Sequence, residues 1–434
     1  MKLSKFTLVY KNKDKYILAN TLTKGIIRLE EEAYNDLFRS EETLTFLTPA
    51  QYRKCKEMGF LVEDNLNEEN QVRFALERKR LGLKQMSLYF TFSTNCNFAC
   101  KYCYELGQVE YMSMTDSVVN GTIDWVEEQA KRESLNKVII YLYGGEPLLY
   151  KKEMVSFLCE LKQRLSVLNV DLFAQLVTNG TLIDKDTINE LMQCGLREVH
   201  ISIDGTEQIH NDHRPYKNGK GSYSDIISSI ELLKNNFPNL TITCRVGIDN
   251  SSTDEALNIL DVLASYNENN NIYPYFAAIT NTTEQMKSET SYCNQNVASK
   301  KELVRIYKLA FAKMKKLGFK LQDFFTVGPC MAVSANSFAV YPNGDIYSCL
   351  DMIGHETEKV GNVFDFNLSA RYYDFCRAKH LEKCYKSVCE YLPICGGGCL
   401  LKQFLNSEGY DKPDCPKKLL KEMNKATILA KYGD

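Results

Sequence analysis

Strand-like and helix-like segments alternate between residues 86 and 320. Apolar runs predict strands at 87–93, 137–144, 172–178, 198–204, 240–248 and 272–278. Segments with helical spacing lie between and after them, at 115–133, 151–168, 184–194, 223–236, 253–266 and 299–317. Because parallel strands need long crossover connections, this order predicts a parallel sheet. Six units are fewer than the eight of a closed barrel, so the fold class is α/β, a partial (β/α)6 TIM-like barrel.

The segments on either side of this region have different patterns. Residues 1–85 carry short strands at 6–10, 16–20 and 25–29, two helices and a closing strand at 60–62, which predict a small α+β, winged-helix-like domain. Beyond residue 321, Asn343-Gly344 between two alternating segments predicts a hairpin. The chain is therefore expected to have three domains, at 1–85, 86–320 and 321–434.

Charge and apolar content exclude several classes of function. The 434 residues have a net charge of -2, so no basic field attracts nucleic acid or an anionic membrane. No apolar run reaches the roughly 18 residues of a transmembrane helix, and the N-terminus lacks a signal core. We expect a cytoplasmic protein without nucleic-acid or membrane partners.

The chain has 16 cysteines but only 5 histidines. In a cytosolic chain, so many cysteines favour metal binding over disulfides. Two groups contain ten of them: Cys96, Cys100 and Cys103, then Cys330, Cys349, Cys384, Cys389, Cys395, Cys399 and Cys415. The other six are scattered: Cys55, Cys159, Cys194, Cys244, Cys293 and Cys376. All of these except Cys376 are interpreted as small apolar core residues.

The first group follows directly on the first strand of the βα region, where parallel folds place their chemistry. Three close thiolates can hold three irons of a [4Fe–4S] cluster and leave the fourth iron open. A zinc site would need a fourth local ligand, which no nearby Cys or His supplies. A zinc site and an unligated structural trio are the alternatives.

Cys-x3-Cys-x2-Cys with Tyr102 before the last cysteine resembles the signature of radical S-adenosylmethionine (SAM) enzymes. The resemblance implies a partial βα barrel. It also implies that the open iron binds SAM, and that an electron from the cluster cleaves SAM to methionine and a 5′-deoxyadenosyl radical. That radical abstracts a hydrogen atom from the substrate.

The same resemblance extends to residues that would contact SAM. Gly144, Gly145 and Glu146 look like the glycine-rich motif that binds the methionyl amino group. Asn179, Ser202 and Asp204 end the next two strands and resemble polar SAM contacts, with the ribose assigned to Ser202 and Asp204. Arg214 resembles an arginine that pairs with the SAM carboxylate. Ordinary turns or a surface cation are the alternatives, and the flanking His210 and His213 are expected to be solvated loop residues.

The second group resembles the SPASM extension of radical SAM peptide-modifying enzymes, which carries two auxiliary [4Fe–4S] clusters. The resemblance assigns an outer cluster to Cys384, Cys389, Cys395 and Cys415, and an inner cluster to Cys330, Cys349 and Cys399. The four-residue gap between Cys384 and Cys389 departs from the usual two. Two clusters need eight ligands, and the motif offers seven thiolates. For the eighth position there are three alternatives: Cys376, His355, or an iron left open to the substrate. A disulfide-rich or zinc-ribbon segment is the alternative.

Two further comparisons bear on the reaction. Sulfatase maturases have an Asp base directly after the inner-cluster cysteine, whereas Leu350 follows Cys349 here and Asp351 comes one position later. No catalytic acid or base is therefore assigned. Residues 1–85 look compatible with the domain that binds a leader peptide by strand addition in related enzymes; a folding appendage is the alternative.

These features predict a radical SAM oxidoreductase that matures a ribosomally made, Cys-containing precursor peptide by thioether crosslinking. Three [4Fe–4S] clusters, SAM and an electron donor such as ferredoxin or flavodoxin are expected. The alternatives are formylglycine formation in a sulfatase, C–C crosslinking, epimerisation, and a non-catalytic iron–sulfur or zinc scaffold.

Overall fold

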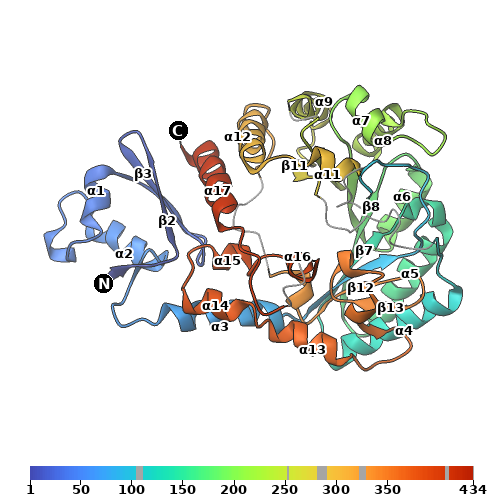
Figure 1. The fold of residues 1–434 in the computed structure, drawn as a ribbon, viewed down its shortest axis with the longest axis horizontal. Helices are drawn as coiled ribbons and strands as arrows, with labels where there is room; N and C mark the ends of the chain where they lie inside the picture. The colour runs from blue at the N-terminus through green and yellow to red at the C-terminus, as the bar shows by residue number, and fades with distance from the viewer. Residues whose placement is uncertain (104–110, 252–253, 281–290, 322–328, 406–409, 434) are drawn as a thin grey trace. The chain divides into compact units, whose positions relative to one another are not determined.

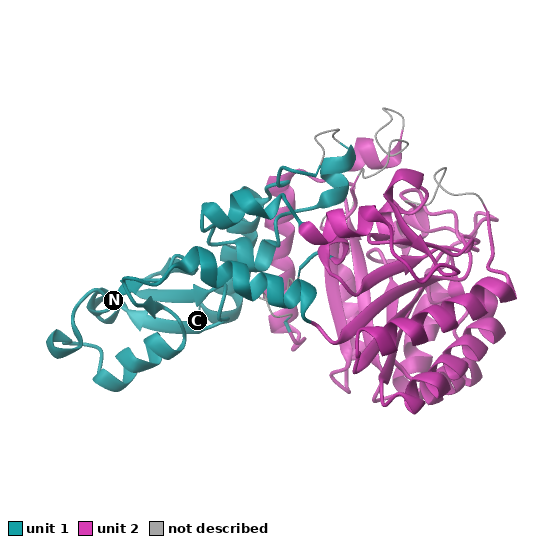
Figure 2. Cartoon of the chain, turned by 90° about the horizontal axis from the view of Figure 1, so that it is seen from below, with its two compact units in different colours: residues 1–82, 321–330, 378–434 teal, residues 83–320, 331–377 magenta. Residues whose placement is uncertain are grey.

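The computed structural model describes residues 1–103, 111–251, 254–280, 291–321, 329–405 and 410–433. The chain divides into two compact units (Figure 2). Unit 1 comprises residues 1–82, 321–330 and 378–434, and unit 2 comprises residues 83–320 and 331–377. No helix in the described ranges is long and apolar enough to cross a membrane.

Unit 2 is built on one sheet of mostly parallel strands (Figure 1). The six predicted strands are confirmed as β6 (Gln85–Thr91), β7 (Lys137–Tyr143), β8 (Asp171–Thr178), β9 (Leu196–Ser202), β10 (Thr241–Ile248) and β11 (Ile272–Ala278). Each pairs in parallel with its sequence neighbour, which gives the order β11-β10-β9-β8-β7-β6. The partial βα barrel is therefore confirmed.

Helices follow the strands at nearly the predicted positions. They are α4 (Asp116–Arg132), α5 (Lys151–Val167), α6 (Lys185–Gln193), α8 (Tyr223–Asn236), α9 (Ile259–Tyr266) and α12 (Lys300–Lys316), with the shorter η2 (Pro147–Tyr150), α7 (Glu207–His213), η3 (Glu255–Asn258) and α11 (Tyr292–Asn296). Side-chain oxygens of Thr115, Asp184 and Ser299 cap three of the long helices. Alternate residues of the strands are fully buried, as in β7, and the other side chains line the barrel interior.

The predicted hairpin is present and extends the same sheet. Strand β12 (Ser337–Val340) pairs in parallel with β6, and β13 (Asp345–Tyr347) and β14 (Lys359–Asn362) continue in antiparallel pairing. Gly344 forms the turn with a φ of 89°. The short η4 (Met331–Val333), η5 (Leu350–Met352), η6 (Glu356–Glu358) and α13 (Ala370–Arg377) complete this segment. Because its strands join the barrel sheet, residues 331–377 group with unit 2, which differs from the predicted boundary at residue 321.

Unit 1 combines the two ends of the chain. Its antiparallel sheet has the order β2 (Thr7–Asn12), β3 (Lys15–Asn20) and β4 (Ile26–Glu30), and β1 (Lys2–Leu3) pairs with β5 (Leu61–Val62). The N-terminal helices are α1 (Glu31–Asp36), η1 (Glu41–Thr43), α2 (Pro49–Glu57) and α3 (Glu68–Leu81). The C-terminal ones are α14 (Leu381–Lys386), α15 (Leu392–Cys395), α16 (Leu400–Leu405) and α17 (Lys417–Tyr432).

One apolar core joins these two ends of unit 1. Its members come from β2 and β3 on one side and from the cysteine-rich segment and α17 on the other: Leu8, Tyr10, Ile17, Ala19, Tyr391, Ile394 and Ile428. Arg73 of α3 donates to both carboxylate oxygens of Glu382 in α14, at 2.7 and 2.9 Å. Thr21 Oγ1 donates to the carbonyl of Glu390 at 2.6 Å. The predicted ranges 1–85 and 321–434 therefore share packing rather than standing apart.

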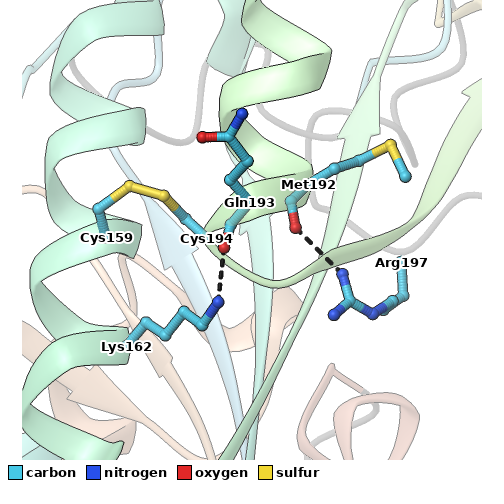
Figure 3. The surroundings of a disulfide bond; sticks show 6 residues. All are labelled: Cys159, Lys162, Met192, Gln193, Cys194 and Arg197. Atoms are coloured by element: carbon cyan, nitrogen blue, oxygen red, sulfur yellow. Dashed lines mark hydrogen bonds between the residues drawn. A yellow bond between two sulfur atoms is a disulfide. The ribbon is translucent and has the colours of Figure 1, made fainter.

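Two of the scattered cysteines form a disulfide, Cys159–Cys194 (Figure 3). The prediction of independent core cysteines is wrong for this pair. The end of α6 lies against α5, and the two Cα atoms are 4.7 Å apart, which is within disulfide range. Lys162 and Arg197 donate to the carbonyls of Gln193 and Met192 beside it, which satisfies the C-terminus of α6.

Candidate active site

A cavity of about 460 Å³ in unit 2 contains most of the residues predicted to bind the cluster and SAM. It lies at the carboxyl ends of the barrel strands. The predicted residues that line it are Cys96, Cys100, Tyr102, Cys103, Gly144, Gly145, Asn179, Ser202 and Arg214. Glu146 and Asp204 do not line it, because both are fully buried behind its wall. Residues from the ends of four strands therefore meet around one space.

The two glycines after β7 fit the backbone that leads into the cysteine loop. A Cβ on Gly144 would lie 2.4 Å from the Ser93 carbonyl oxygen, and one on Gly145 would lie 2.3 Å from that of Asn95. Gly145 N–H also donates to Ser93 O at 3.0 Å. The glycines therefore allow the loop before Cys96 to pack against the end of β7.

Glu146 holds the end of β7 to the end of β8. Its carboxylate accepts hydrogen bonds from Thr178 Oγ1 at 2.7 Å, from the backbone N–H of Asn179 at 2.7 Å and from that of Leu148 at 2.9 Å. Burial raises the pKa of Glu146. With both oxygens engaged inside the protein, Glu146 positions Asn179 rather than facing the cavity.

Asp204 has a similar supporting position below the cavity wall. Its carboxylate accepts the Gly247 backbone N–H at 2.9 Å and the hydroxyl of Tyr102. Burial opposes its ionisation, but the His213 ring and the Arg214 guanidinium outweigh burial and hold its pKa below the ordinary range. Tyr102 also accepts a hydrogen bond from Arg214 Nη1 at 2.8 Å. Asp204 therefore orients Tyr102, and Tyr102 orients Arg214.

The two histidines beside Arg214 are buried on α7, so the prediction of solvated loop residues is wrong. His210 Nδ1 accepts the backbone N–H of Asp204 at 3.1 Å, and burial lowers the pKa of His210 to about 3. His213 lies between two buried carboxylates, 3.7 Å from Asp204 and 3.6 Å from Asp249. Both histidines therefore support the Asp204 side of the site.

A hydroxyl from a distant segment completes this support. Tyr292 Oη of α11 lies 2.8 Å from His213 Nε2 and donates to Asp249 at 2.6 Å. Sequence reasoning did not identify Asp249 or Tyr292. Neither residue belongs to a local motif, so no signal in the sequence pointed to them.

The chemistry of Arg214 fits a carboxylate ligand. Its guanidinium lines the cavity, and its buried Nε atom has no hydrogen-bond partner within the described residues. A buried donor without a partner is costly, so a ligand that accepts from it stabilises the site. A planar guanidinium can bind a carboxylate through two parallel hydrogen bonds.

The three cysteines fit an iron–sulfur ligand set. Burial raises the pKa of Cys96 to about 11 and also raises the pKa of Cys100, so thiolates here need positive charge, which bound iron provides. Across the described ranges, no three His, Cys, Asp or Glu side chains converge closely enough to bind one metal ion. A [4Fe–4S] cube differs, since each cysteine binds its own iron and the sulfurs surround the cluster.

The rest of the cavity wall was not identified from the sequence. It includes many aromatic side chains together with polar and apolar ones: Tyr89, Tyr141, Tyr143, Gln175, Val177, Thr178, His200, Arg245, Tyr275, Ala278, Ile279, Thr280, Leu350 and Asp351. Tyr89 and Tyr141 stack with ring centroids 4.3 Å apart. Most of these residues occupy inward positions of alternating strands, a pattern that marks the interior without specifying chemistry.

In unit 1, the four cysteines predicted for the outer cluster come together. Cys384, Cys389, Cys395 and Cys415 line one small hollow with Tyr391, so the longer gap between the first two does not separate them. Cys330 and Cys399 also belong to unit 1, whereas Cys349 belongs to unit 2. Cys376 of α13 and His355 belong to unit 2, and the Cys376 thiol contacts Tyr372.

Comparison with known proteins agrees with this site. The profile of the Radical SAM superfamily matches residues 90–263, which include the cysteine loop and the strands around the cavity. Residues 90–263 are a radical SAM domain. The chain is therefore an enzyme, and the superfamily of this domain uses a [4Fe–4S] cluster and SAM.

Relatives of this radical SAM chain include maturases. The cysteine-type anaerobic sulfatase-maturating enzyme of Clostridium perfringens (strain 13 / Type A) is 23% identical over 334 residues, 71% of this chain and 86% of that protein. The serine-type enzyme of Bacteroides thetaiotaomicron is 32% identical over 151 residues, 32% of this chain and 34% of that protein.

Two solved structures share the fold of this radical SAM chain. The anSMEcpe enzyme with bound AdoMet has a TM-score of 0.62 at 20% identity, covering 80% of this chain and 97% of that one. Streptococcus suis SuiB bound to precursor peptide SuiA has a TM-score of 0.54 at 17% identity, covering 95% of this chain and 98% of SuiB.

Proposed function

We propose that this radical SAM enzyme matures a ribosomally made, Cys-containing precursor peptide by forming thioether crosslinks. In this proposal Cys96, Cys100 and Cys103 hold the cluster at the cavity, and Arg214 pairs with the SAM carboxylate. Asn179 and Ser202 contact the rest of SAM from the ends of β8 and β9. Glu146, Asp204 and Tyr102 keep these groups in place through the hydrogen bonds described above.

When bound, the cofactors supply a 5′-deoxyadenosyl radical that takes a hydrogen atom from an acceptor carbon, and an auxiliary cluster that accepts one electron as sulfur bonds to that carbon. Each link removes two hydrogens from the peptide. One leaves the carbon as an atom, and the other leaves the cysteine thiol as a proton and an electron. The chain's own part is to hold the peptide over the cavity and to exclude water from the radical.

The convergence of Cys384, Cys389, Cys395 and Cys415 on one hollow is the observation that supports the proposal most. A cluster site in addition to that of the SAM cavity is unnecessary for hydrogen abstraction alone, but it suits an oxidation that leaves an electron to be removed. From the cysteine spacing alone, we propose that Cys330, Cys349 and Cys399 hold the inner cluster, with its fourth ligand position open to the substrate thiol.

The three-stranded sheet of unit 1 is the proposed site for the leader peptide. Strand β4 is at its edge, and its outer side pairs with no strand in the described part of unit 1. A peptide that adds as a further strand would gain main-chain hydrogen bonds, with alternate side chains giving specificity. SuiB, whose fold is similar, binds a precursor peptide.

Formylglycine formation in a sulfatase is the second candidate, and one observation favours it. Asp351 lines the cavity beside Leu350, so a carboxylate is present although it comes one position later than in sulfatase maturases. Burial raises the pKa of Asp351, which suits a group that takes up a proton. The sulfatase-maturating relatives add weight to this candidate.

Anaerobic co-expression with a short Cys-containing peptide encoded near this gene distinguishes the candidates. Intact mass should show the loss of two hydrogens per link, with the linked cysteines resistant to alkylation and unreactive toward aldehyde reagents. Aldehyde-reactive product would establish formylglycine chemistry instead. A Cys96→Ala, Cys100→Ala, Cys103→Ala variant is the control and should leave the peptide unchanged.

A further inference from the structure

Arg245 is a second arginine in the wall of the SAM cavity. It lies on β10 in register with Ser202 of β9 on one side and Tyr275 of β11 on the other. Its neighbours in sequence, Cys244 and Val246, are fully buried on the opposite face of the sheet. The guanidinium therefore enters the barrel interior, where it lines the cavity.

Arg245 forms no ion pair in the part of the chain that the structure describes. Among the described residues, no carboxylate lies within 4.0 Å of its guanidinium. Asp204, the acid that influences it most, already accepts hydrogen bonds from Gly247 and Tyr102. Glu198, deeper on the same face of β9, is held by Gln175 at 2.8 Å and Thr243 at 2.5 Å. A cation inside a protein cavity without such a partner favours an anionic ligand.

Two neighbours of Arg245, His200 and Tyr275, add hydrogen-bonding groups. His200 Nε2 lies 3.0 Å from Tyr275 Oη, and both residues line the cavity. Burial and the two arginines lower the pKa of His200 to about 4, so the ring is neutral near pH 7. The positive potential on this side of the cavity therefore comes from arginine.

SAM carries one carboxylate, which Arg214 is positioned to bind. We propose that Arg245 recognises a second carboxylate, that of an Asp or Glu side chain, or of the C-terminus, in the peptide segment that enters the cavity. This inference rests on the proposed function and specifies its substrate: the acidic group lies close to the modified residue. His200 and Tyr275 provide further hydrogen bonds to this second carboxylate.

Chemical labelling tests the inference without an identified peptide. Phenylglyoxal labelling of the anaerobic holoenzyme, mapped by mass spectrometry, should modify Arg245 with SAM present. N-acetyl-glutamate N-methylamide should slow this labelling, whereas its neutral glutamine analogue should not. Protection by N-acetyl-alanine instead would indicate recognition of a C-terminal carboxylate. The inference would be overturned if SAM alone fully protected Arg245 from labelling. It would also be overturned if Arg245 were labelled at equal rates in the presence of the glutamate and the glutamine analogue.

Variants provide a second and independent readout. Arg245→Gln should weaken binding of the peptide that the enzyme modifies. The expected effect is a KM increase of about tenfold, which corresponds to the loss of one charge-assisted hydrogen bond. SAM affinity and the electron paramagnetic resonance spectrum of the SAM-bound cluster should stay unchanged. Arg197→Gln, at an exposed position of β9, is the matched control and should leave KM unchanged.

The outcomes separate this inference from the proposed function. If the wild-type enzyme modifies no peptide, the proposed function fails. If it modifies the peptide and Arg245→Gln leaves KM unchanged, only the inference fails. A change in SAM affinity or in the cluster spectrum would assign Arg245 to the cofactors and contradict its role in substrate recognition.

Discussion

The Glu146 carboxylate accepts a hydrogen bond of 2.7 Å from the backbone N–H of Asn179, which joins the ends of two neighbouring barrel strands. The same carboxylate accepts from Thr178 and Leu148. A residue expected to contact SAM directly is thus part of the frame that positions Asn179, another predicted SAM contact.

Glu146→Gln should lower the free energy of unfolding by about 2 kcal/mol, because an amide group facing the backbone donors leaves one of them without an acceptor. Urea unfolding of the anaerobic holoenzyme measures this loss. Glu160→Gln, in a partly exposed ion pair with Arg164 on α5, is the control and should cost less than about 0.5 kcal/mol. Unchanged stability with lost SAM binding would show that Glu146 is a direct ligand instead.

Gly145→Ala should reduce loading of the cluster at the SAM cavity. Its Cβ would lie 2.3 Å from the Asn95 carbonyl oxygen, so the loop that carries Cys96 must move. Iron content should fall from about twelve atoms per chain to about eight, as one of three proposed cubes is lost.

Gly219→Ala is the control for that variant. Gly219 has a φ of +81°, but no atom lies within 4 Å of its added Cβ, so it tests backbone strain without a collision. Equal iron content in both variants would contradict the packing role of Gly145.

Stability should decline on acidification because of His200. Its pKa is about 4 in the folded chain against 6.5 ordinarily, so between these values the unfolded chain binds more protons. The free energy of unfolding should therefore fall as pH drops through this window. His200→Gln should show a shallower decline in urea midpoint between about pH 7 and about pH 5. Tyr275→Phe, which keeps the imidazole, should retain the wild-type slope; identical slopes in all three proteins would refute the assignment.

Loss of the outer cluster site should loosen the N-terminal sheet. Cys389 and Cys395 pack against the core that contains Tyr10 and Tyr391. Cys389→Ala should therefore increase amide hydrogen exchange in β2 and β3, with little change in α4 of unit 2.

Cys55→Ala is the matched control, because Cys55 is buried in the other apolar core of unit 1. It should increase exchange near α2 and leave β2 protected. Wild-type exchange in β2 and β3 of the Cys389→Ala protein would show that the sheet does not depend on the cluster site.

The sequence predicted what is encoded locally. The bounds of strand β7 were predicted within one residue because its apolar run is bounded by turn residues. The cysteine spacings predicted two groups of cysteines that the structure brings together, one at the cavity and one at the hollow of unit 1. Contacts between distant segments were not predictable in this way. The pairing of His213 with Tyr292 spans 79 residues, and the disulfide joins cysteines 35 residues apart. The inward side of a strand was predictable, but the role of Arg245 on it depends on which acids lie nearby.

Transfer of deuterium from the peptide to the 5′-deoxyadenosine that is formed from SAM tests the central claim most directly. A precursor peptide with deuterium at its carbon positions would be treated with the anaerobic holoenzyme, SAM and a reductant in ordinary water. The account predicts 5′-deoxyadenosine with one deuterium per link, and a peptide that has lost one carbon-bound deuterium and one alkylatable cysteine for each. Modified peptide accompanied by 5′-deoxyadenosine without deuterium would contradict the account.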